Sequence, residues 1–213
     1  MPTYRLWLPL VFALISSAEV IDRIAVSVGN QVITEAQILD ELRITAFLNN
    51  QKPGITPDQK KAAAERLIEQ ALVKREMELS RFPLPDQTEA APLETELQAK
   101  YGSAAQFDQA LAQAGIGKQN LEQRLWWQLT LLRFIDYRFR PSIQIPETAV
   151  KTYYEKKRAE WERQGVKPVP TLEDSRAGIE KILTEQRVDR AMDRWLGDTR
   201  TRIEILYRKE AFE

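Results

Sequence analysis

Apolar residues recur every three or four positions along most of the chain, which is the spacing of amphipathic helices. Leu67, Ile68 and Ala71 belong to one such stripe, which follows a threonine and a proline suited to the start of a helix. Stripes of this kind predict helices at about residues 34–49, 57–80, 88–101, 103–115, 118–139, 146–163 and 171–199. The chain is therefore expected to be mainly helical.

Two short segments instead alternate apolar with other residues, and these predict strands. In the first, at about residues 20–28, Ile24, Val26 and Val28 share one side, and a Gly-Asn turn pair then indicates a hairpin or a strand and its return. The second covers residues 202–207. Because a lone strand leaves its backbone groups unpaired, we expect the N-terminal and C-terminal strands to pair. The predicted fold class is mainly α, a multi-helix module with a small β-element that joins its two ends.

The start of the chain has the pattern of a cleaved secretory signal. Arg5 precedes an apolar run at residues 6–15, and a Ser-Ser-Ala sequence then supplies the small side chains that signal peptidase requires. The run is about ten residues long, short of the roughly 20 that span a bilayer, although an uncleaved anchor is an alternative. We expect a signal peptide at residues 1–18 and an exported domain at residues 19–213 without stable membrane insertion.

The composition limits the chemistry that this domain can perform. The chain contains no His and no Cys, which excludes imidazole bases, thiol nucleophiles, disulfides and the usual zinc sites. Its 31 basic and 31 acidic residues balance, so no general attraction to nucleic acid is expected. Carboxylate pairs such as Asp189 and Asp193 are expected by chance on the solvated helix faces of so charged a chain. We therefore expect no catalytic residue, no metal ion and no cofactor.

Segments near the two ends resemble the SurA-like periplasmic chaperones. The segment at residues 20–34 reads VIDRIAVSVGNQVIT, similar to the valine-rich strand, turn and return that open the chaperone module of that family. The segment at residues 185–196 reads EQRVDRAMDRWL, and with the IEIL that follows at residues 203–206 it is similar to the last helix and strand of the module. The resemblance covers most of residues 19–213 in order and implies a helical chaperone module that works in the periplasm.

One departure from the family is informative. Its members often carry one or two parvulin-type prolyl isomerase domains between the helix that ends here near Trp161 and the helix that begins near Thr171. Only a short loop is predicted there, whereas a domain needs at least about 50 residues. The chain also lacks the His and Cys residues on which parvulin sites rely. The isomerase activity is therefore not carried over, and we do not expect an enzyme.

The helix predicted at residues 118–139 holds the main candidates for client binding. It is apolar nearly all round, so it is either buried on several sides or offers an adhesive surface to a client. Packing in the core is the competing interpretation for each of its aromatic residues. The candidate client contacts are Trp126, Trp127, Phe134 and Tyr137, with Tyr153 and Tyr154 as second choices.

Three classes of function are compatible with these patterns. The first is a chaperone that holds unfolded exported polypeptides, such as outer-membrane protein precursors, without ATP. The second is a helical adaptor that docks one folded envelope partner. The third is an enzyme, for which an isomerase is the obvious form and the short loop the main objection. A homodimer is compatible with the same sequence patterns.

Overall fold

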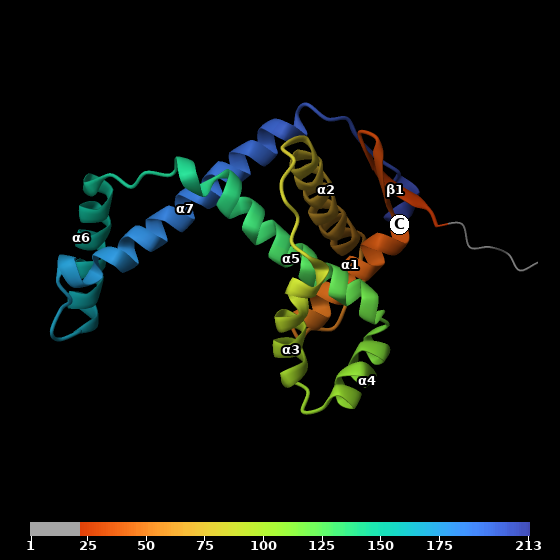
Figure 1. Cartoon of the computed structure of the whole chain (residues 1–213), viewed down its shortest axis with the longest axis horizontal. Coiled ribbons are helices and arrows are strands. Elements are labelled where there is room, and N and C mark those ends of the chain that lie inside the picture. The colour runs from red at the N-terminus through yellow and green to blue at the C-terminus, as the bar shows by residue number, and fades with distance from the viewer. Residues whose placement is uncertain (1–21) are drawn as a thin grey trace, which may run out of the picture.

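The structure, a computed structural model, describes residues 22–213 (Figure 1). The predicted signal peptide and the first two residues of the predicted N-terminal strand lie outside the described residues. The strands are β1 (Ile24–Val28), β2 (Gln31–Thr34) and β3 (Ile205–Tyr207); the α-helices are α1 (Glu35–Leu48), α2 (Pro57–Leu79), α3 (Ala91–Ala99), α4 (Ala104–Ala114), α5 (Lys118–Arg138), α6 (Glu147–Gln164) and α7 (Leu172–Arg200); and the short 3-10 helices are η1 (Gln87–Ala90), η2 (Arg140–Ser142) and η3 (Lys209–Ala211). The fold is mainly α with a small antiparallel sheet, as predicted.

The sheet joins the two ends of the described chain. Its order is β2-β1-β3, and β1 pairs antiparallel with both neighbours. Val28 lies opposite Ile205 and Val26 lies opposite Tyr207, so the predicted pairing of the N-terminal and C-terminal strands is confirmed. The third strand is shorter than the predicted 202–207, because the backbone before it still forms the turn that ends α7.

The prediction that Ile24 lies on the same side of the strand as Val26 and Val28 is wrong. The pairing of β1 with β2 shifts register between these two residues, which is the mark of a β-bulge. The extra residue turns Ala25 into the core and leaves Ile24 44% exposed. The alternation in the sequence therefore applies only to the part of β1 that follows the bulge.

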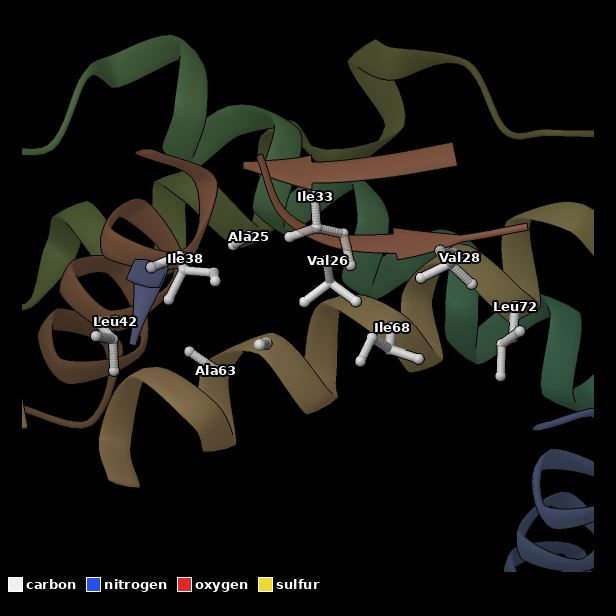
Figure 2. Packing of buried hydrophobic residues seen from close by; sticks show 12 residues of the cluster. Ala25, Val26, Val28, Ile33, Ile38, Leu42, Ala63, Ile68 and Leu72 are labelled. Carbon is white, nitrogen blue, oxygen red and sulfur yellow. The ribbon is translucent and has the colours of Figure 1, made fainter. Parts of the chain in front are cut away.

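The central core lies between the sheet and the first two helices. Figure 2 shows the side chains of Val26 and Ile33 directed toward α2, where Ile68 and Leu72 are buried against them. α2 begins with a capping box at Thr56, as the threonine and proline there predicted. This core fixes the hairpin of β1 and β2 over the two helices.

Helix α5 crosses the body and joins two further clusters of buried side chains. Near its start, Leu121 packs with Phe107 of α4; toward its end, Phe134 packs with Met77 of α2. The helix predicted at residues 88–101 is divided into η1 and α3, with Pro92 in the first turn of α3. A proline has no backbone donor and is best accommodated at the start of a helix, which accounts for the division.

Helix α6 and the first half of α7 project from the body as a two-helix arm (Figure 1). The arm has a small cluster of its own, in which Val150, Ile179 and Leu183 are buried. The short loop between the two helices, at residues 165–171, carries no additional domain, as predicted.

Tyr207 of β3 belongs to a polar cluster that ties the sheet to α2 and α7. Its hydroxyl donates to Glu65 Oε1 at 2.6 Å, and the Arg200 guanidinium donates to the same carboxylate. Burial, together with the hydrogen bond to Glu65, raises the pKa of Tyr207 from 10.0 to about 12. The folded state therefore holds the phenol proton at a pH where the unfolded chain has lost it.

This pKa shift predicts a loss of stability at alkaline pH. Since the pKa of Tyr207 is higher in the folded state, its contribution is complete below about pH 10 and falls as the pH rises toward 12. We expect the free energy of unfolding of the native protein to exceed that of Tyr207→Phe at pH 7, and the difference to shrink above pH 10. Urea unfolding of both proteins at a series of pH values measures this difference in the free energy of unfolding. A difference that stayed constant to pH 11 would contradict the shift.

Candidate functional site

A hollow of the body lies between α5 and the surface formed by β2, α1 and α2, and we call it the amide cleft. It measures about 600 Å³. Its lining includes five glutamines and two tryptophans: Gln31, Gln37, Gln70, Gln87, Gln123, Trp126 and Trp127. The glutamines come from β2, α1, α2, η1 and α5, so that each side of the cleft supplies at least one amide.

A second hollow continues the amide cleft along α5. It lies between η1, α3 and the first half of α5 and measures about 310 Å³. Gln87, Gln123 and Trp126 line both hollows, so the two meet along these three side chains. A polypeptide bound in one hollow would therefore contact side chains that also line the other.

The two adjacent tryptophans contribute to the cleft in different ways. The Trp126 indole is half-buried, and its Nε1 donates to the carbonyl of Pro85 at 3.0 Å, which fixes the orientation of the ring. Trp127 is 6% exposed and belongs to the core that α5 shares with α2. Successive helical residues point about 100° apart, so only Trp126 presents a substantial part of its ring to the hollows.

A lysine lies at the side of the cleft that Trp127 closes. The Lys74 ammonium sits 5.2 Å from the centre of the Trp127 ring, close enough for a cation–π interaction. Partial desolvation there lowers the pKa of Lys74, and the nearby Glu78 opposes the shift. The lysine thus places one cation against the aromatic wall.

The carboxylates in the cleft are already engaged by basic or amide groups. Glu41, 6% exposed, accepts from Arg66 Nε at 2.9 Å and lies 3.4 Å from Arg124 Nε. Asp40 accepts from Arg43 at 3.2 Å and from Asn120 at 2.8 Å. These bonds tie α1 to α2 and α5, and they leave a lining without a dominant negative charge.

Of the aromatic residues predicted on α5, only the tryptophans line the amide cleft. Phe134 is fully buried, with its ring edge-on to Phe82 and Phe139 at centroid distances of 5.4 Å and 6.3 Å. The ring faces the core between α2 and α7, so in this structure Phe134 offers no surface to a client. Tyr137 is 56% exposed but lies beside Phe82, near the opposite end of α5 from the second hollow.

The second-choice tyrosines lie in the arm and not in the body. Tyr153 and Tyr154 are half-buried on α6 and pack against the small cluster that α6 shares with α7. The Tyr154 hydroxyl donates to the carbonyl of Pro170 at 3.0 Å, which braces the loop at the tip of the arm. The structure thus does not bring these tyrosines together with the tryptophan pair.

The residues that the sequence analysis missed are the glutamines and the edge of β2. Neither has a local signal, because the five glutamines are spread over about 90 residues of sequence and meet only when the elements pack. Gln87 and Gln123 are exposed, and Gln31 and Gln70 are half-buried. A glutamine on a polar helix face looks in the sequence like any other solvated residue.

The side chains that line the site are suited to non-covalent binding. Amide side chains both donate and accept hydrogen bonds, and an indole ring adds apolar area. Within residues 22–213 there is no group of three or more acidic residues placed to hold a metal ion. Over the same residues, no helix combines the length and the apolar character needed to cross a bilayer.

Comparison with known proteins adds no family to this picture. A scan against protein-family models finds no match for the chain, and a search of curated proteins finds no similar sequence. The resemblance to SurA-like chaperones rests on the residues quoted for it.

Proposed function

We propose that this protein is a periplasmic chaperone that holds unfolded exported polypeptides, outer-membrane protein precursors among them, without ATP and without isomerase chemistry. The observation that carries the proposal is the amide cleft: an open, roughly 600 Å³ hollow that combines an indole surface with five glutamine amides. Trp126, Gln87 and Gln123 also line the second hollow, which adds binding surface beside the cleft.

The lining suits unfolded polypeptides of many different sequences. Every residue of an unfolded chain except proline offers one backbone donor and one backbone acceptor, and a glutamine amide can satisfy either. The Trp126 ring accepts aromatic or aliphatic side chains, such as those that alternate along the strands of outer-membrane proteins. Because the cleft is open, bound segments stay partly hydrated and affinity stays modest, so release follows from mass action.

The periplasmic location is supported by the signal-like pattern at residues 1–18 and by the resemblance to SurA-like chaperones. An exported protein has no ATP to drive release, which agrees with a mechanism based on weak binding alone. The carboxylates Asp40 and Glu41 are paired within the protein, so acidic clients are not repelled strongly from the cleft.

Filling the cleft at the junction of the two hollows tests the proposal. Gln123 is exposed and lines both hollows, so Gln123→Trp places a bulky ring where the client would pass. We expect the variant to need about fivefold more protein for the same suppression of aggregation, which corresponds to about 1 kcal/mol of lost affinity. The measurement is light scattering of a chemically unfolded outer-membrane protein diluted into buffer at several molar ratios of chaperone.

Leu132→Trp is the matched control, because Leu132 is 57% exposed on the same helix and is not among the residues that line either hollow. It should suppress aggregation as well as the native protein does. Equal loss in both variants would place client binding outside the cleft. No suppression by the native protein would favour the adaptor hypothesis and a search for one folded partner.

A further inference from the structure

The free edge of β2 lines the amide cleft. Among the described residues, 22–213, β2 has a strand partner on one side only, because the sheet order is β2-β1-β3. Gln31, Val32 and Ile33 are all among the residues that line the cleft, and Val32 is 51% exposed. A strand edge is therefore part of the same hollow as Trp126 and the glutamines.

Hydrogen bonds to β3 show which way the backbone of β1 points. The carbonyl of Ala25 accepts a bond of 2.8 Å, and the N–H of Gly29 donates one of 2.9 Å, both on the β3 side. The backbone N–H and C=O groups of successive residues point to opposite sides of a strand. Those of Val26 and Val28 therefore point toward β2.

The partners of these two residues in β2 are Ile33 and Gln31. Their backbone groups therefore point back to β1, and those of Val32, which lies between them, point away from the sheet. Within residues 22–213 the N–H and C=O of Val32 have no hydrogen-bond partner, so they can form one hydrogen-bonded pair with a further strand.

This edge also lacks the features that usually protect a strand from pairing. Native proteins block exposed edges with lysine, proline or a bulge. The sequence of β2 is QVIT, and the bulge of this sheet lies in β1. At the other edge, the Tyr207 hydroxyl of β3 is held by Glu65, and two basic residues, Arg208 and Lys209, follow.

We propose that β2 accepts an added strand: an extended segment of client, poor in basic residues, pairs its backbone with Val32 and lays side chains on Trp126. The nearby glutamine amides bind the peptide groups that Val32 does not reach. This inference rests on the proposed chaperone function and specifies how the client is recognised, by its backbone more than by its sequence.

The shape and the charge of the cleft favour a single extended strand over a second copy of this protein. The cleft lies between α5 on one side and β2, α1 and α2 on the other. A single extended segment can enter this space, whereas the sheet of a second folded copy would collide with α5. Lys74 is the one charged residue of its lining that makes no ion pair within residues 22–213, which disfavours basic segments.

The test uses fluorescence anisotropy of a labelled peptide of about ten residues that alternates Phe or Val with Ser or Thr. A second peptide has the same sequence with every backbone nitrogen methylated, which removes the donors along both edges without changing the side chains. We expect N-methylation to weaken binding to the native protein about three- to tenfold, the range for the loss of one or two backbone hydrogen bonds.

Val32→Pro is the matching change in the protein, since it removes the outward N–H at an edge position where proline is tolerated. We expect a similar loss of affinity, and a larger one than for Val32→Ala, which also shortens this cleft-lining side chain but keeps the N–H. N-methylation should then have little further effect on Val32→Pro. If that variant does not fold, as judged by circular dichroism, the two peptides still decide the question with the native protein.

Equal affinity for both peptides overturns the inference and leaves the chaperone function intact, provided that aggregation is suppressed. If neither peptide binds and the native protein does not suppress aggregation, both the inference and the proposed function are overturned. A dimer of the native protein that Val32→Pro dissolves, measured by sedimentation, would show that a second copy occupies the edge and would also overturn the inference.

Discussion

A chain truncated after Thr201 should lose its cooperative thermal unfolding transition. The truncation deletes β3 and therefore one of the two strand partners of β1. It also removes Ala211, which is fully buried in the central core, and Phe212, which packs against that core. Both strand pairing and apolar burial are lost at the point where the ends of the described chain meet.

The truncation also removes hydrogen-bond partners from a buried charged side chain. Lys60 is 7% exposed, and its ammonium donates to Glu35 at 3.1 Å, to the Ala211 carbonyl at 3.2 Å and to Glu213 O at 3.1 Å. Only the bond to Glu35 survives, and each hydrogen bond lost from a charged group costs about 1.5–3 kcal/mol. Together with the lost strand, this is comparable to the total stability of a domain, about 5–15 kcal/mol.

Circular dichroism during heating measures the effect of the truncation. Leu206→Thr is the control, because Leu206 is 45% exposed on β3 and its side chain contributes little to the core. The control should melt cooperatively within about 3 °C of the native protein. A truncated chain that keeps a cooperative transition near the native temperature would show that β3 and η3 are accessory to the fold.

Most of the helical fold is predictable because helical periodicity is a local signal. The stripes placed the helices within a few residues, and the need of each strand for a partner predicted that the two ends meet. The bulge at Ala25 was not predictable, because one extra residue leaves the alternation of neighbouring side chains looking regular. Whether the bulge stabilises the sheet depends on which residues Ile24 and Ala25 contact in the folded protein.

The site was only partly predictable for a related reason. A helix that is apolar on nearly every side does not reveal which face meets the core, and Trp126 and Phe134 look equivalent in the sequence. In the structure, Phe134 faces α2 and α7 while Trp126 faces the two hollows. The amides that complete the cleft come from five separate elements, so their proximity is a property of tertiary packing alone.

Two aromatic residues of α5 should differ strongly in how much they contribute to the free energy of unfolding. Phe134→Ala should destabilise the protein by about 3–5 kcal/mol, because the ring is fully buried against Phe82 and Phe139 and its removal leaves a cavity. Tyr137→Ala, on the same helix, should cost about 1 kcal/mol or less, because Tyr137 is 56% exposed and loses chiefly its contact with the Phe82 ring. Urea unfolding followed by tryptophan fluorescence measures both values.

The same two variants separate core packing from client binding. At a temperature where circular dichroism shows both to be folded, each should suppress the aggregation of an unfolded outer-membrane protein within about twofold of the native protein, since neither residue lines the amide cleft. If Phe134→Ala instead kept its stability and lost suppression, the ring would have to leave the core to meet the client. That result would mean that α5 separates from α2 when a client binds, and that the cleft seen here is the closed form of a larger site.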